Sequence, residues 1–445
     1  MELGHQSGVD WKKLFAQRGF RFFFAGVFVS LCGSGMNFAG VTWYVLGRTN
    51  STVQVSLLLI LMTIPGLFIP LFGGVLIDRM DRRRLGMTLD IARGFVVAGI
   101  SALFFLHRGG LGSIYTMVIL LGVGSAIYWS NTNALVQEVI SSGELVTANS
   151  AVLIAVQGGL AISGGLVGFI YDRAGIAGIL AIDASSYFIS AFCLYRLRRG
   201  YFAPHVTHRI DLPEPLETPL AVAEETSMPP LIEPAFEAGF IGEFREGIHY
   251  LRNHPNVLAL GLTYACMIAG VISANVLVVA LTKDILRAGA TGYGLMESGW
   301  AVGAVAGGFA AGFLVKHIRP ARVLMISLVT LAIGNALFPY ARWLAIATIM
   351  HGIFGACRAL GGVLTQSAIM TAVPRRLMGR TQSTFAVLST LMQIMMSFSL
   401  GWLAQYSGLP VAFALLGIIY SGAVVAAFRA RSMARATATV EALPG

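Results

Sequence analysis

Residues 73–86 read GGVLIDRMDRRRLG, and six of the seven positions from Asp78 to Arg84 are charged. The stretch lies between two long apolar segments of a chain that is 56% hydrophobic and only 12% charged. A soluble protein of this length would carry roughly a quarter charged residues. A short, strongly basic stretch between two apolar segments is typical of a loop that joins two membrane-spanning helices.

Apolar stretches of about 20 residues recur along the chain, and each is long enough to cross a bilayer as a helix. Lipid offers no hydrogen-bond partners, so the backbone N–H and C=O groups of each segment must bond to one another. Helices are therefore expected. The sequence therefore predicts an all-α membrane protein with twelve transmembrane helices in two six-helix, pseudo-symmetric halves. The expected spans are 20–46, 54–77, 87–106, 113–134, 148–170 and 175–195, then 256–281, 293–315, 323–340, 344–366, 382–404 and 409–428.

These spans divide the chain into five parts. Residues 1–19 form an N-terminal tail, 20–195 the first bundle, 196–255 a linker with an amphipathic helix, 256–428 the second bundle and 429–445 a C-terminal tail. If the N-terminus is cytoplasmic, 23 of the 31 lysines and arginines fall on the cytoplasmic side, six on the opposite side and two inside spans. Because basic residues gather on the cytoplasmic side, both termini are expected there, in a multi-pass protein of the inner (plasma) membrane.

Composition and motifs exclude several classes of function. The net charge of +10 would suggest nucleic acid in a soluble protein, but here the basic residues flank spans, so no nucleic-acid partner is expected. The chain has no HExxH, no GxSxG and no cluster of His, Asp and Glu in the spans, which argues against an enzyme, a metal or a cofactor. It also lacks GxxxxGK[ST], which argues against ATP-driven pumping. The four cysteines lie in apolar segments without CxxC spacing and are expected to be buried.

The two halves repeat each other. GGVLIDRMDRRR follows the second span and AGFLVKHIRPAR follows the eighth, at an offset near 235 residues. Parallel six-helix repeats are the plan of one large transporter class.

The basic stretch Gly74-x-Leu76-x-Asp78-Arg79-x-x-Arg82-Arg83 resembles the loop motif of the major facilitator superfamily, with Asp81 where that family usually has glycine. FRFFFAGVFVSLCGSG, DRMDRRR, FREGIHYLRNHP and RLMGRTQS resemble its drug and siderophore exporter branch, which contains macrolide efflux pumps and the enterobactin exporter.

The resemblance implies a conformational latch. In the family, the motif aspartate caps a helix N-terminus across the inner face, an interaction worth about 0.3–1 kcal/mol when exposed. Here the latch would be Asp78, supported by Arg79 and Arg82, and the receiving helix end would begin at Thr381 and Gln382. Gly74 and Arg83 complete the motif. The alternative is that these charges only anchor the topology.

Ionisable side chains inside spans are costly and are functional candidates by default. Asp90 and Arg93 lie one helical turn apart and can pair with each other or with the basic loop, as a structural extension of the latch. Asp183, in LAIDASSYF, is the first candidate for proton coupling, because a carboxylate inside a span could exchange a proton. Its alternative is a packing acid bonded to a hydroxyl.

Three further candidates lie in the second half. Glu297, in GLMESGW, is a candidate for an outer gate. His351 could transfer protons or simply pack. Arg358, in GACRALGG, could extend to the interface, pair with an internal acid or attract an anionic substrate.

These features predict a secondary active transporter that exports amphipathic small molecules (a drug, a macrolide or a siderophore) by alternating access and proton antiport. Its partners would be the small-molecule substrate, protons and the lipid bilayer, and we expect a monomer without cofactors. One alternative is a lysophospholipid or lipid transporter of the same fold. Another, from a different class, is a non-transporting membrane sensor or scaffold, for which the short tails offer no added domain.

Overall fold

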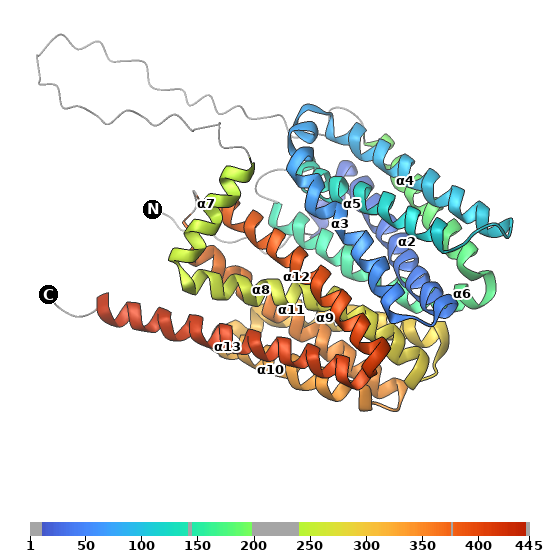
Figure 1. Cartoon of the computed structure of the whole chain (residues 1–445). Helices are drawn as coiled ribbons and strands as arrows, with labels where there is room; N and C mark the ends of the chain where they lie inside the picture. Colours follow the sequence, from blue (N-terminus) through green and yellow to red (C-terminus); the bar gives the residue numbers. More distant parts are fainter. Residues whose placement is uncertain (1–10, 141–144, 198–239, 375–376, 442–445) are drawn as a thin grey trace, which may run out of the picture.

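The computed structural model describes residues 11–140, 145–197, 240–374 and 377–441. All regular structure in these residues is helical, and the long helices lie roughly alongside one another (Figure 1). Helices α2 to α6 form one half of the molecule and α8 to α13 form the other. This arrangement confirms the all-α, two-half architecture expected from the sequence.

The first half begins with a short helix, α1 (Trp11–Ala16), followed by long helices that pack on one another. The last of them, α6, reverses direction at Gly175, where φ is +61° and ψ is −165°. Glycine tolerates a positive φ, so one residue suffices for the turn between two antiparallel legs. The long helices are α2 (Arg18–Thr49), α3 (Thr52–Arg79), α4 (Arg82–Phe105), α5 (Leu111–Val139) and α6 (Leu145–Arg196).

The second half follows α7 (Phe240–Asn253), a helix within the predicted linker. Pro255 occupies the first turn of α8, where its missing N–H costs nothing, and so separates α7 from α8. The elements are α8 (Pro255–Ala280), the π-helical η2 (Leu281–Ile285), α9 (Gly289–His317), α10 (Pro320–Leu337), the 3-10 turn η3 (Phe338–Tyr340), α11 (Leu344–Ala372), α12 (Met378–Ser407) and α13 (Leu409–Glu441).

Ten of the described helices are long and apolar enough to cross a membrane. One of these, α6, crosses twice because of its turn at Gly175. The remaining crossing is α9, a glycine-rich helix of 29 residues that carries Glu297. The chain therefore crosses the membrane twelve times, as expected. Large apolar side chains such as Phe95, Phe309 and Ile418, which are 66%, 71% and 67% exposed, form the surface that faces lipid.

Both ends of the described chain lie at the same end of the bundle, which we call the terminal end (Figure 1). The opposite, or distal, end holds the turn at Gly175 and the connections α2–α3, α4–α5, α8–α9, α10–α11 and α12–α13. At the terminal end, α7 contacts the first turns of α12 through an ion pair between Glu246 and Arg380. The rest of the predicted linker, from residue 198 to residue 239, lies outside the described residues.

Helices α9 and α11 approach each other at glycines spaced four residues apart. Gly299, Gly303 and Gly307 lie on one face of α9, against Thr348, Gly352 and Ala356 of α11. A Cβ atom added at Gly303 would lie 1.8 Å from the carbonyl oxygen of Gly352. Small residues at this spacing allow the backbones of two membrane helices to come into contact. In lipid, van der Waals attraction stabilises this contact, because the hydrophobic effect does not drive membrane helices together.

We expect Gly303→Ala to destabilise the protein by about 1–3 kcal/mol, because the added methyl group must push two backbones apart. Gly308→Ala is the matched control, since a Cβ atom there meets nothing within 4 Å. Thermal unfolding in detergent should show a lower midpoint for Gly303→Ala and an unchanged or higher midpoint for Gly308→Ala. Equal midpoints for the two variants would contradict the packing described here.

Candidate functional site

Asp90 and Arg93 lie inside the first half, one turn apart on α4, and form an ion pair. Asp90 also accepts a 2.7 Å hydrogen bond from Ser190 Oγ on α6. The guanidinium carbon of Arg93 lies 4.1 Å from the ring centre of Tyr128 and 4.6 Å from that of Tyr187. The structure thus shows the internal pairing, one of the two arrangements that the sequence left open.

Asp183 belongs to the same region, since it lies one turn before Tyr187 on α6 and is fully buried. Asn37 Nδ2 donates a 2.5 Å hydrogen bond to Asp183 Oδ2, whereas Oδ1 has no hydrogen-bond partner among the described residues. We call Asp90, Arg93, Tyr128, Asp183 and Tyr187 the Arg93 cluster. The cluster contains two carboxylates and one guanidinium, so one carboxylate has no cation of its own.

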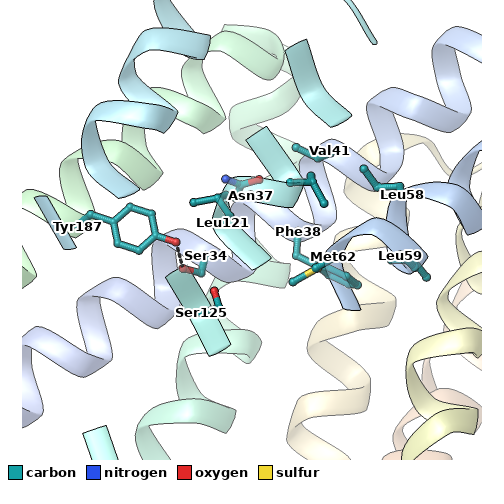
Figure 2. Close-up of a pocket in the computed structure, with 11 residues that line it drawn as sticks. Ser34, Asn37, Phe38, Val41, Leu58, Leu59, Met62, Leu121, Ser125 and Tyr187 are labelled. Atoms are coloured by element: carbon teal, nitrogen blue, oxygen red, sulfur yellow. Dashed lines mark hydrogen bonds between the residues drawn. The ribbon is translucent and has the colours of Figure 1, made fainter. Parts of the chain in front are cut away.

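A pocket with about 490 Å³ of empty space, part of it open to solvent, lies beside the Arg93 cluster, between α2, α3, α5 and α6. Its polar wall includes Ser34, Asn37 and Tyr187, and the hydroxyl oxygens of Ser34 and Tyr187 are 2.9 Å apart (Figure 2). Asn37 lines the cavity and also donates to Asp183. The buried carboxylate is therefore one hydrogen bond away from the cavity.

A second and larger cavity, of about 820 Å³, lies mainly in the second half and includes space open to solvent. Glu297, His351 and Arg358 all line it, so the structure brings together three of the four candidates for coupling or substrate binding. Phe38 of α2 and Leu160 of α6 close it from the first half. We call it the central cavity. Its other lining residues are Gly270, Val271, Ile272, Ala274, Asn275, Val278, Trp300, Leu331, Asn335, Phe338, Phe354 and Tyr420.

Glu297 and His351, in the central cavity, each have one buried polar atom without a hydrogen-bond partner among the described residues. Glu297 lies about 12 Å along α9, two turns from its start, and its Oε1 is buried without a hydrogen-bond partner among the described residues. His351 is 7% exposed, stacks on Phe338 with ring centres 5.8 Å apart, and has an unpartnered Nδ1 within the described part of the chain. An outer-gate role for Glu297 stays a prediction, but its neighbour Ser298 donates a 2.7 Å bond to the carbonyl of Ala161 in the other half.

The predicted latch is only partly described. The backbone of α3 is helical through Arg79, but the side chains of Asp78 and Arg79 and the surroundings of Gly74 are not described. The receiving end, at Thr381 and Gln382, is the first turn of α12. Thr381 is buried there, and its hydroxyl has no hydrogen-bond partner in the described residues. Contact between Asp78 and this helix end therefore stays a prediction.

The rest of the basic loop holds the first half together. Arg82 Nη1 lies 3.0 Å from Glu138 Oε1 on α5. Arg83 donates two 2.8 Å hydrogen bonds, from Nε and Nη2, to the carbonyls of Leu194 and Tyr195 at the end of α6. An arginine at a helix C-terminus satisfies carbonyls that have no partner within the helix.

Asp81, the departure from the family motif, has a local role. It is the N-cap residue of α4, and its carboxylate accepts a 2.9 Å hydrogen bond from the backbone N–H of Arg84. A side-chain cap of this kind is typically worth about 1 kcal/mol. The aspartate therefore stabilises the first turn of α4 in place of the usual glycine.

Hydrogen bonds join the two halves from the distal end to the middle of the bundle. Lys283 Nζ donates to Asn50 Oδ1 and, at 3.0 Å, to the carbonyl of Leu46 at the end of α2. Thr52 N donates to Gln405 Oε1 at 2.9 Å. We call these bonds, together with the 3.1 Å bond between Thr291 and Asp172, the distal clasp.

The deepest bond between the halves runs from Gln393 to Thr63, near the middle of α12 and α3. The hydrogen bonds described between the halves thus lie from the distal end to the middle of the bundle. Sequence reasoning missed the clasp, because Asn50, Lys283 and Gln405 are far apart along the chain and sit in no motif.

Asp90→Ala should lower the free energy of unfolding by about 3–5 kcal/mol, because it leaves the buried Arg93 cation without its carboxylate. The double variant Asp90→Ala/Arg93→Met should recover more than half of this loss. Unfolding titrations in mixed micelles would measure both, with Asp284→Ala, at an exposed distal carboxylate, as the control. A double variant no more stable than the single one would show that the ion pair does not account for the effect.

Lys283→Met should weaken the distal clasp and populate a state in which the distal end is open. Spin labels at Arg108 and Arg342, on distal loops of the two halves, would report longer distances in this variant. A hydrogen bond to a charged group contributes about 1.5–3 kcal/mol, enough to change the ratio of two states more than tenfold. Arg173→Met is the control, since Arg173 contacts only its own helix in the contacts described, through Phe169. An unchanged distance distribution in Lys283→Met would rule out this role.

Comparison with known proteins agrees with this architecture. A family model of the Major Facilitator Superfamily matches residues 23–279. The enterobactin exporter of Salmonella typhimurium strain LT2 is 24% identical over 365 residues, which cover 81% of this chain and 80% of that protein. The enterobactin exporter of Citrobacter koseri is 25% identical over 365 residues, covering 81% and 79%.

Solved structures share the fold. The nucleoside transporter NupG superposes with a TM-score of 0.69 at 12% identity, covering 93% of this chain and 99% of that one. A bacterial homologue of the iron transporter ferroportin gives a TM-score of 0.62 at 16% identity, covering 92% and 98%. The family model spans more than half of the chain, and the helices form two repeated halves around a cavity. The chain therefore belongs to the major facilitator superfamily and is a membrane transporter rather than an enzyme.

Proposed function

We propose that the chain is a secondary active exporter that moves amphipathic small molecules across the inner membrane in exchange for protons. The central cavity carries this proposal. Its wall contains the carboxyl group of Glu297, the imidazole of His351 and the guanidinium of Arg358, and it is otherwise largely apolar and aromatic. An amphipathic cargo would place its apolar part against Trp300 and Phe354 and its polar part against the ionisable groups. Because similar proteins are named as enterobactin exporters, a siderophore is the best-supported cargo.

The orientation follows from charge. Lysines and arginines gather at the terminal end, so both termini would be cytoplasmic. The distal clasp would then close the outer side, and the structure would represent the state that takes up cargo from the cytoplasm. In the opposite state, Asp78 would latch the terminal end onto the start of α12. We propose a monomer as the working unit, because both six-helix halves that alternating access requires belong to one chain.

Asp183 is the proposed site of proton coupling. The Arg93 cluster has one carboxylate in excess of its cation, and Asp183 Oδ1 has no partner among the described residues. Asn37 links this carboxylate to the neighbouring cavity. A proton on Asp183 would remove the excess charge, and its release would restore it, so that the charge state of the cluster differs between the two steps of a cycle. Glu297 and His351 are the next candidates.

Transport by purified protein in reconstituted vesicles tests the proposal, with a proton gradient and three cargoes: a cationic dye, a macrolide and a catecholate siderophore. We expect one cargo to accumulate in vesicles with an acidic lumen and the terminal end outside, and to stop when the gradient is collapsed. Asp183→Asn should abolish the dependence on the gradient, because an amide cannot release a proton. Asp284→Asn, at an exposed distal carboxylate, should transport like the wild type.

Two other outcomes separate the parts of the proposal. Gradient-driven transport that survives in Asp183→Asn would refute coupling at Asp183 and direct attention to Glu297 and His351. No transport of any of the three cargoes by folded protein would contradict the proposed cargo class, and lysophospholipid would be tested next.

A further inference from the structure

Two arginines lie deep inside spans, and they are satisfied differently. Arg93 is 5% exposed, pairs with Asp90 and lies against two tyrosine rings. Arg358 is the fifteenth residue of α11, about 21 Å from the start of that helix. It forms no ion pair with any described residue, although it lines the central cavity. A cation in the middle of a membrane protein is costly and persists where it serves a purpose.

Most of the N–H groups of Arg358 have no hydrogen-bond partner among the described residues. Its Nε donates a 3.1 Å bond to the carbonyl of Met267 on α8, which holds the side chain against that helix. A guanidinium has five N–H donors, and this is the one that finds a described acceptor. Gly362, one turn further along α11, leaves room for the head group, since a Cβ atom there would lie 2.5 Å from Arg358 Nη1.

The surroundings of Arg358 suit an aromatic acid. Trp300, Phe354 and Tyr420 line the central cavity, so an aromatic ligand there would contact aromatic side chains. His351 lies two turns before Arg358 on the same helix and lines the same cavity with an unpartnered nitrogen. Glu297, also in the wall, forms no ion pair with Arg358 in the described residues, so the guanidinium fork remains open to a ligand.

We propose that Arg358 is the anion-binding group of the central cavity and selects cargoes in which an acidic group is attached to an aromatic body. The carboxylate or phenolate of the cargo would accept hydrogen bonds from the remaining N–H groups of Arg358, and its ring would lie against the aromatic side chains of the wall. Arginine suits this role because its planar fork binds a carboxylate at two points. This inference deepens the proposed function and narrows its cargo to anions, which excludes cationic dyes and macrolides.

Equilibrium dialysis against the full chain in nanodiscs tests the site, with 2-naphthoate and its neutral isostere 2-naphthamide as probes and empty nanodiscs to subtract partitioning. We expect the wild type to bind naphthoate about tenfold more tightly than the amide. Arg358→Gln should remove this preference, whereas Arg358→Lys should keep part of it. Arg342→Gln, at an exposed distal arginine, is the matched control and should keep all of it.

Glu297→Gln provides a second readout if Arg358→Gln does not fold. Removing a carboxylate from the wall of the same cavity should strengthen naphthoate binding about threefold and leave the amide unchanged, as expected if the anionic group of the probe binds inside the central cavity. Equal binding of the two probes by the wild type, no saturable naphthoate binding, or a preference that survives in Arg358→Gln would overturn the proposal. This experiment measures binding, so it can support the anion site even if proton-driven transport fails. Conversely, proton-driven transport can be found even if the preference for naphthoate is absent.

Discussion

An unpaired charge is expensive in hydrocarbon, and this cost determines where the chain places its ionisable side chains. Arg93 and Asp90 satisfy each other within one turn of α4, with Ser190 and two tyrosines completing their surroundings. This buried pair ties α4 to α6 and makes the first half a unit with a polar centre. Asp183 can be accommodated beside it because Asn37 supplies a hydrogen bond from α2.

The two halves meet through contacts of a different kind. Glycines at the α6–α9 crossing bring backbones together: a Cβ atom at Gly164 would lie 2.6 Å from the carbonyl of Gly294. Hydrogen bonds from Thr291 and Ser298 at this crossing, and from Lys283 to the end of α2, also join the halves. Bonds of this strength can break and reform, whereas the Arg93 cluster cannot be disrupted without a large loss of stability. The interior of one half is thus stable, and the junction between halves is adjustable.

Much of the fold could be predicted from the sequence, because the length of an apolar stretch is a one-dimensional signal. The twelve spans, the turn near residue 175 and the break at His254-Pro255 follow from hydropathy, glycine and proline. Which helix face points inward depends on packing, and the pattern of residues does not encode it. The cost of charge in lipid singled out Asp183, Glu297, His351 and Arg358 as candidates for proton coupling or the substrate cavity, but it did not show that the last three share one cavity. The roles of Asp81 and Arg83 depend on where helix ends meet, which no motif records.

The single-residue turn at Gly175 has a mechanical consequence. The first leg of α6 carries Gly164, Gly168 and Asp172, which touch α9 across the junction, and the second leg carries Asp183, eight residues beyond the turn. No loop separates the two legs, so Gly175 alone connects them. A displacement of the first leg against α9 must pull on the second leg, and hence on the bond between Asp183 and Asn37. The folded-back helix therefore connects the contacts between the two halves with a buried carboxylate in the interior of the first half.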